Sequence, residues 1–323
     1  MVVDIQSHII SRKYIEYYKE HCSYPKINIK DDSVILEYDN MTLNYGWEKT
    51  SPNSIAKMME AHGIDLVLLS PSRPDVACLP EKYLAEGTRI CNDGIQDAIN
   101  RFPGKFKGVG YLPWILPEEA IHEANRLKEL GFVGVMLCSH LNMKPADLPE
   151  LEPVYKELSR LRLVLFLHPT NPEWSEYLLP SMVTMVGYVV TESFCLLRLI
   201  LSGILERNPE LKVILPHCGG ILPMLSGRIR NQTEVMKKGM ENISIPPMKI
   251  LTSGQVYFDL VSPDPKVMRF ASDVLGGTDH FMFATDYPWG NPKKLQECVK
   301  AAFPDIDEQK KLFGENAKKI FQL

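Results

Sequence analysis

Short apolar runs alternate with longer segments of helical period along the whole chain. The short runs are rich in β-branched and aliphatic residues, and eight of them lie at Val2–Ile5, Ile64–Ser70, Phe106–Tyr111, Gly134–Leu137, Val164–His168, Lys212–Leu215, Val256–Asp259 and Phe281–Ala284. Most are continuously apolar rather than alternating, which is typical of strands covered on both faces. The pattern therefore predicts eight buried strands.

The longer segments between these runs carry helix signals. In "TSPNSIAKMMEAHGID", Thr50 or Ser51 can cap the helix, Pro52 suits its first turn and Gly63 can end it. "PEEAIHEANRLKELGF" repeats this plan, and a more apolar helical segment stops at Asn208-Pro209. A short helix in "GENAKKIF" closes the chain.

Eight strand–helix units favour a (β/α)8 barrel, with a doubly wound open sheet as the alternative. No glycine-rich phosphate turn follows any early strand, which counts against the open sheet. The stretch "KINIKDDSVILEYDNMTLNY" alternates with period two, with turn signals at Asp31-Asp32-Ser33 and Asp39-Asn40. It predicts a small antiparallel flap at about residues 24–46, inserted after the first strand, in one domain spanning 1–323.

Composition narrows the class of partner. Of 323 residues, 45% are hydrophobic, and 36 basic side chains face 40 acidic ones for a net charge of −4. This balance gives no electrostatic reason to expect nucleic acid or an anionic membrane, and we expect no apolar run near the roughly 18 residues of a spanning helix. Seven scattered cysteines without a C-x-x-C pair or a secretory leader indicate reduced thiols and a cytoplasmic protein.

Polar residues stand where four of the predicted strands end. A barrel places its chemistry at the carboxyl ends of its strands, so we expect these side chains to meet at one mouth: Asp4, Gln6 and His8 after the first strand, His168 after the fifth, His217 after the sixth and Asp286 after the eighth.

Imidazoles and carboxylates hold zinc, manganese or iron while leaving a position open for water or substrate. Each residue also has a structural interpretation: His168 can cap a strand end, and Asp286 before Tyr-Pro can begin a turn. The repetition at four strand ends favours a functional site. His140 follows the fourth strand and is a further candidate, whereas the remaining histidines are interpreted as structural: His21, His62, His122 and His280.

Five motifs together resemble a known family: "FLHPTNP", "LILSGILERNPELKVILPHCGGILPMLSGRI", "YFDLVSPDP", "FATDYPWG" and "GENAKKIF". The chain resembles, nearly end to end, the amidohydrolase-related family that includes α-amino-β-carboxymuconate-ε-semialdehyde decarboxylase and γ-resorcylate decarboxylase. The run from Leu199 to Ile229 is the most specific part of this resemblance.

The resemblance implies a barrel with one divalent metal, zinc first and manganese or magnesium as alternatives. His8, His168 and Asp286 match family metal ligands, with Gln6 as a fourth candidate, and His217 matches a catalytic histidine beside the metal. Arg228 in "SGRI" matches an arginine that reaches a neighbouring subunit's site and pairs with a substrate carboxylate, a pairing that suits guanidinium geometry. We therefore expect a homodimer or homotetramer, with His140 as a second candidate substrate-binding residue.

Two departures from the family pattern affect the expected chemistry. Gln6 replaces a histidine or glutamate, and its neutral carbonyl oxygen is a weaker metal donor than either. The segment "NYGWEK" before Pro52 holds no arginine where the semialdehyde decarboxylase has one, and Lys49 is the cation nearest that position.

The sequence therefore predicts a metal-dependent non-oxidative decarboxylase of a small unsaturated or aromatic carboxylic acid. Asp286 would supply the proton and His217 would assist. A hydrolase or hydratase using the same ligands is the alternative. A binding or scaffold protein with a decayed metal site, suggested by Gln6, is a third hypothesis.

Overall fold

The eight predicted strands form a single parallel sheet. The structure is a computed structural model, and it describes residues 1–39, 41–172 and 174–323. Neighbouring strands follow chain order: β1 (Val3–Ile9), β5 (Leu66–Pro71), β6 (Phe106–Tyr111), β7 (Gly134–Cys138), β8 (Val164–His168), β9 (Val213–Leu215), β10 (Val256–Asp259) and β11 (Phe281–Met282).

The first strand meets the last. The backbone N–H of Ile5 donates to Phe283 O at 3.1 Å, and that of Asp286 donates to Gln6 O at 2.9 Å. The sheet therefore closes into the expected (β/α)8 barrel, and the open doubly wound alternative is wrong.

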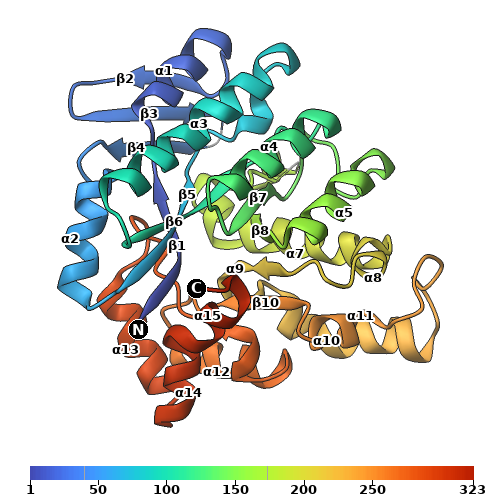
Figure 1. Cartoon of the computed structure of the whole chain (residues 1–323). Coiled ribbons are helices and arrows are strands. Elements are labelled where there is room, and N and C mark those ends of the chain that lie inside the picture. Colours follow the sequence, from blue (N-terminus) through green and yellow to red (C-terminus); the bar gives the residue numbers. More distant parts are fainter. Residues whose placement is uncertain (40, 173) are drawn as a thin grey trace.

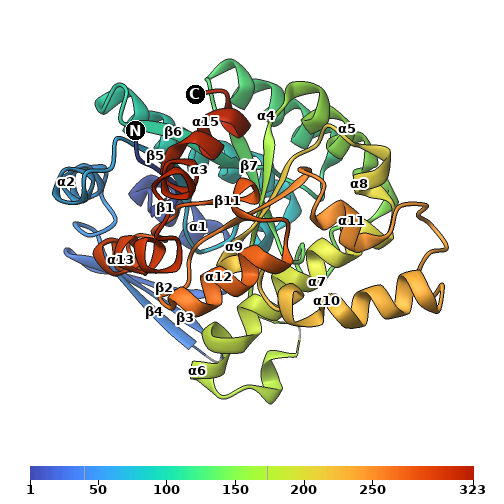
Figure 2. The ribbon, with the colours of Figure 1, turned by 90° about the horizontal axis from the view of Figure 1, so that it is seen from below.

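Helices surround the sheet on its outer side (Figures 1 and 2). The longer ones are α1 (Arg12–His21), α2 (Pro52–His62), α3 (Glu81–Arg101), α4 (Pro117–Glu129), α5 (Glu152–Leu161), α7 (Tyr188–Leu201), α10 (Leu222–Arg230), α12 (Pro265–Val274) and α13 (Pro292–Ala302). Short helices complete the connections: α6 (Pro180–Met182), α8 (Ile204–Arg207), α9 (Pro216–Gly219), α11 (Pro247–Leu251), α14 (Ile306–Lys310) and α15 (Asn316–Phe321).

The continuous apolar runs arise because each strand faces two cores. In β5, Val67 and Leu69 pack outward against the helices, whereas Leu68 packs inside the barrel. In β8, Leu165 faces the outer core and Phe166 the inner one. Successive side chains of a strand point to opposite faces, so a strand buried on both faces is apolar at every position.

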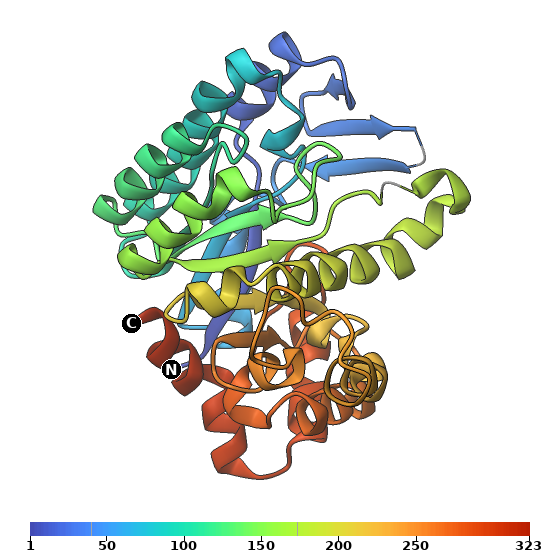
Figure 3. The same ribbon diagram turned by 90° about the vertical axis from the view of Figure 1, so that its right-hand side faces the viewer.

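A separate three-stranded antiparallel sheet forms the predicted flap. Its strands are β2 (Lys26–Ile29), β3 (Ser33–Tyr38) and β4 (Met41–Gly46). Along the chain, α1 follows β1 and precedes the flap. Asn40, in the second predicted turn, lies outside the described residues. The flap lies on the same side of the barrel as the start of α7 (Figure 3), where the Tyr188 hydroxyl contacts Met41 Sδ at 3.5 Å. It therefore forms part of the wall around the barrel mouth.

One helical stretch corrects the expectation about apolar runs. Pro180–Leu201 spans 22 residues and is long and apolar enough to cross a membrane by length and composition. Half of its most apolar window is buried inside the protein. A helix packed against the core of a globular protein meets the same criterion, because burial by protein and burial by lipid both select apolar residues.

Candidate active site

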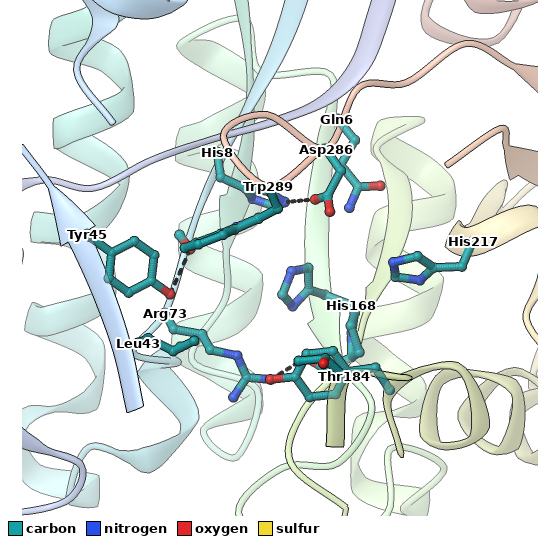
Figure 4. A pocket seen from close by; sticks show the side chains of 13 residues that line it. Gln6, His8, Leu43, Tyr45, Arg73, His168, Thr184, His217, Asp286 and Trp289 are labelled. Carbon is teal, nitrogen blue, oxygen red and sulfur yellow. Dashed lines mark hydrogen bonds and ion pairs between the residues drawn. The ribbon is translucent and has the colours of Figure 1, made fainter. Parts of the chain in front are cut away.

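The predicted site residues converge on one cavity at the carboxyl ends of the strands. The cavity measures about 260 Å³, and Gln6, His8, His168, His217 and Asp286 all line it (Figure 4). Residues from 6 to 286 therefore meet at one mouth, as the strand-end pattern predicts.

His8 is oriented by groups from the neighbouring strand. Its Nδ1 lies 3.0 Å from Ser70 Oγ and 3.2 Å from Pro71 O, and its Nε2 lies 3.0 Å from Asp286 Oδ1. The ring is 1% exposed and stands edge-on to His168, with ring centroids 5.3 Å apart. The contacts at Nδ1 direct Nε2 toward Asp286.

Asp286 is positioned by Asp4. The Asp4 carboxylate accepts hydrogen bonds from the Thr285 backbone N–H at 2.9 Å, the Thr285 hydroxyl at 2.5 Å and the Ser7 hydroxyl at 2.7 Å. Asp286 itself has a φ of 52°, in the left-handed region. Asp4 is fully buried, and burial raises its pKa to about 6 despite these hydrogen bonds. Asp4 is therefore not a pocket-lining group but an anchor for the turn that presents Asp286.

His168 is a neutral imidazole in the pocket wall. Burial and, secondarily, the electrostatic effect of the neighbouring His8, Arg73 and His217 lower the pKa of His168 well below its ordinary value. Its buried Nδ1 has no hydrogen-bond partner among the described residues. An unpartnered buried nitrogen is costly, and binding a cation would relieve that cost.

These donors fit a divalent metal. Two ligand atoms that each lie about 2.1 Å from one ion are roughly 3–3.5 Å apart, and the His8–Asp286 separation of 3.0 Å falls in that range. As the side chains stand, no three His, Cys, Asp or Glu residues in the described part of the chain form a complete ligand cluster. The donor types nevertheless suit such an ion: two imidazoles, a carboxylate and the Gln6 amide oxygen.

His217 is held by a buried glutamate that sequence reasoning missed. Its Nδ1 lies 3.0 and 3.1 Å from the two carboxylate oxygens of Glu192 on α7. Burial lowers the pKa of His217, but the charges of Glu192, Asp259 and Asp286 outweigh burial and raise it to about 10. Burial raises the pKa of Glu192, which His217 partly offsets. His217 is thus an imidazolium near neutral pH, able to donate a hydrogen bond to substrate.

Other wall residues also escaped prediction. Arg73 follows β5 in "SPSRPD", and a cation directly after a predicted strand was an available signal. Tyr45 from the flap and Trp289 pack edge to face, with ring centroids 4.9 Å apart. Glu192 lies within an apolar helix, where the sequence pattern indicates only a core position.

Three candidates lie away from this pocket. His140 lines a neighbouring cavity, where its Nε2 lies 2.7 Å from Asn171 O. Lys49 is exposed and lies beside an outer surface depression. Arg228 is exposed on α10, so the role implied for it needs a second subunit.

The sequence model of the Amidohydrolase family matches residues 3–323, so the chain belongs to this family. A curated relative, the gamma-resorcylate decarboxylase of Rhizobium radiobacter, is 27% identical, with 83% of this chain and 86% of that protein covered. The 2-amino-3-carboxymuconate-6-semialdehyde decarboxylase of Dictyostelium discoideum is 25% identical over 99% of this chain and 91% of its own. The expected family resemblance is confirmed.

A relative with another reaction is the 2-keto-4-carboxy-3-hexenedioate hydratase of a Sphingobium strain, 23% identical over 82% of this chain and 80% of that protein.

Among solved structures, the IDCase of Metarhizium anisopliae superposes with a TM-score of 0.87 at 22% identity, covering 100% of this chain and 97% of that one. A Polaromonas dihydroxybenzoic acid decarboxylase, solved with bound manganese and the inhibitor 2-nitroresorcinol, gives a TM-score of 0.79 at 22% identity, with 100% and 97% covered.

Proposed function

We propose that this protein is a metal-dependent non-oxidative decarboxylase of a small aromatic or unsaturated carboxylic acid. The observation that carries the proposal is the meeting of His8, Asp286, His168 and His217 in one cavity of a chain from this family, with Glu192 holding His217 from behind. The decarboxylases among its relatives support the reaction class.

His8, His168 and Asp286 would hold one divalent metal, with Gln6 as a further oxygen donor. When bound, the metal would supply positive charge that offsets the negative charge of a carboxylate substrate. Zinc suits the imidazoles, whereas the carboxylate and amide oxygens suit manganese or magnesium. The manganese in the Polaromonas enzyme makes manganese a second ion to test beside zinc.

The proton chemistry falls to Asp286 and His217. In its acid form Asp286 would deliver a proton to the carbon that carries the departing carboxylate. The carbon–carbon bond then breaks, its electron pair restores the conjugated system, and CO2 leaves. His217, kept protonated beside Glu192, would donate a hydrogen bond to a substrate oxygen whose negative charge grows during the reaction.

The direct test is to incubate protein loaded with zinc or manganese with hydroxybenzoates and muconate-type acids and to measure CO2. CO2 release that stops on chelation supports the proposal. The hydratase among the relatives makes addition of water to a double bond the second candidate. Water addition, or release of an alcohol or amine, without CO2 from any acid would establish that alternative.

We further propose a homodimer or homotetramer in which Arg228 reaches the partner's pocket. Large apolar side chains are exposed on α7 and around α10, with Phe194 51% and Met224 76% exposed, and a self-association surface would cover such groups. Mixing inactive Arg228→Ala with inactive His168→Ala protein tests this arrangement. Recovered activity supports it, and no recovery contradicts it.

We also propose a cytoplasmic location. Free cysteines at all seven positions support this proposal, because thiols stay reduced in that compartment.

A further inference from the structure

Arg73 is a buried cation in the pocket wall. It follows β5, its side chain is 5% exposed, and it lines the cavity that holds His8 and Asp286. It also lines the neighbouring cavity of about 490 Å³ that contains His140 and Asn171. Its guanidinium therefore belongs to the wall shared by both spaces.

Neutral groups hold this guanidinium in place. Nη2 donates to Pro169 O at 3.0 Å, and Nη1 donates to Asn171 Oδ1 at 3.2 Å. The group lies over the rings of Tyr188, at 4.8 Å, and Tyr38, at 5.7 Å. These contacts fix its plane, and the two hydrogen bonds recorded with described residues use two of its five N–H donors.

The carboxylate of Asp75 forms a buried ion pair with this guanidinium without taking up any of its N–H groups. Asp75 Oδ2 lies 3.9 Å from Nη1, beyond hydrogen-bond distance, and Asp75 Oδ1 accepts a hydrogen bond from the Tyr111 hydroxyl at 3.0 Å. A buried guanidinium is best satisfied by a carboxylate that accepts hydrogen bonds from two of its N–H groups. A ligand in the pocket could supply such a carboxylate.

Arg73 lies at the other end of the pocket from the proton-transfer groups. In Figure 4 it is on the far side of His168 from Asp286 and Gln6. The carboxylate that departs has to lie beside Asp286, so a carboxylate that meets Arg73 at the opposite end of the pocket would be a different one. The aromatic walls of Tyr45, Tyr188 and Trp289 favour a flat ligand between the two ends.

We infer that Arg73 binds a second, non-departing carboxylate, which makes the substrate a small planar dicarboxylate. The inference rests on the proposed function, because that function determines which carboxylate of the substrate departs. A cavity of about 260 Å³, near the low end of the roughly 300–1,000 Å³ usual for ligand sites, admits one ring or a short conjugated chain. Arg73 is then a specificity-determining residue.

The test measures binding by calorimetry to manganese-supplied protein with matched acids. 4-Hydroxyisophthalate is compared with salicylate, which lacks the second carboxylate, and with 5-carbamoylsalicylate, in which an amide replaces it. The pair trans,trans-muconate and sorbate, which share the same double-bond geometry, represents open chains. Wild-type protein is expected to bind a diacid about 10- to 100-fold more tightly than its matched monoacid, as expected for hydrogen bonds to a charged group.

Arg73→Gln is expected to abolish this preference by weakening diacid binding, whereas Arg73→Lys keeps part of it. Arg160→Gln, at an exposed arginine on α5, is the matched control and keeps the full preference. Equal affinity of wild-type protein for both members of both pairs overturns the inference, even if Arg73→Gln fails to fold. A preference retained by folded Arg73→Gln overturns it as well.

CO2 release is recorded on the same samples. An Arg73-dependent preference without CO2 rejects the decarboxylase proposal but keeps the diacid site. CO2 release without the preference rejects the diacid site alone.

Discussion

Both carboxylate oxygens of Glu192 lie within 3.1 Å of His217 Nδ1. Glu192 is 0% exposed on α7, whereas His217 sits in the tight turn after β9 with a φ of 53°. The pairing therefore fixes the orientation of a histidine whose backbone is in a strained conformation, and it keeps the ring protonated. Through this pair, helix α7 contributes to the charge of the pocket without lying at a strand end.

Replacing Glu192 with Gln should change the pH dependence of activity. In wild-type protein the pKa of His217 is raised to about 10, so activity that needs the imidazolium declines only as pH rises through that value. Without the carboxylate, burial lowers the pKa, so the decline moves to lower pH and activity at neutral pH falls by about tenfold or more. Glu157→Gln, at the surface pair with Arg160, is the control and leaves the profile unchanged. An unshifted profile in Glu192→Gln would refute the role of this pair.

The same pair makes a prediction about stability. Between pH 6.5 and about 10, folded protein holds a proton on His217 that the unfolded chain has released. The stabilisation from this proton is complete below pH 6.5 and is lost as pH rises through about 10. Melting temperatures of wild-type protein should therefore fall across this window more steeply than those of Glu192→Gln. Parallel curves would contradict the raised pKa.

Metal content tests the three proposed ligands. Removing any one ligand should weaken metal binding, in the variants His8→Ala, His168→Ala and Asp286→Ala. Loss of an outer-sphere partner typically lowers metal affinity roughly 10- to 100-fold, and loss of a direct ligand should cost at least as much. His122→Ala, on α4, is the matched control and retains the metal. Elemental analysis of chelator-free preparations gives the answer. Full metal content in all three variants would show that the metal binds at another site. Absence of metal from wild-type protein would favour a decayed metal site.

Gln6 offers a gain-of-affinity test. Gln6→Glu adds a negative charge to the donor set and should tighten manganese binding by about tenfold, since affinity for hard cations rises with ligand charge. The same change at Gln96, on the outer helix α3, should have no effect. Titration with manganese distinguishes the two variants. Unchanged affinity in Gln6→Glu would place residue 6 outside the coordination sphere.

Asp4 makes a prediction of the same sign as the one for His217, at lower pH. Its pKa is raised from 3.8 to about 6 by burial, so the folded protein holds a proton in this range that the unfolded chain has released. Stability should therefore fall as pH rises from 3.8 to about 6. Asp4→Asn cannot ionise, so its melting temperature should decline less across this range, whereas Asp97→Asn at an exposed position keeps the wild-type slope. An unchanged slope in Asp4→Asn would show that Asp4 ionises normally.

The barrel strands were predictable because burial on both faces leaves an apolar run in the sequence. β6, β8 and β10 have the predicted bounds. β11 is shorter than predicted, since the N–H of Phe283 donates to Leu312 O at 2.8 Å instead of to a neighbouring strand. Helix α2 also follows its signals, with Ser51 as its cap and Gly63 at a φ of 62°.

The site was predictable only where a polar residue interrupts an apolar strand end. His8, His168, His217 and Asp286 meet that condition. Glu192 does not, because one acid within a helix of apolar period gives no sign of its partner 25 residues away. Arg73 follows β5 closely enough to be a candidate, but its burial depends on Tyr38 and Tyr188, which the sequence does not bring together.

The most direct measurement of the central claim is the fate of the substrate carbon in D2O. Metal-loaded protein is incubated there with the carboxylic acid that it converts fastest, and product mass and CO2 are recorded together. Decarboxylation predicts one molecule of CO2 per product and a single solvent deuteron on the carbon that carried the carboxylate. A product that gains the elements of water while retaining its carboxylate would contradict the account.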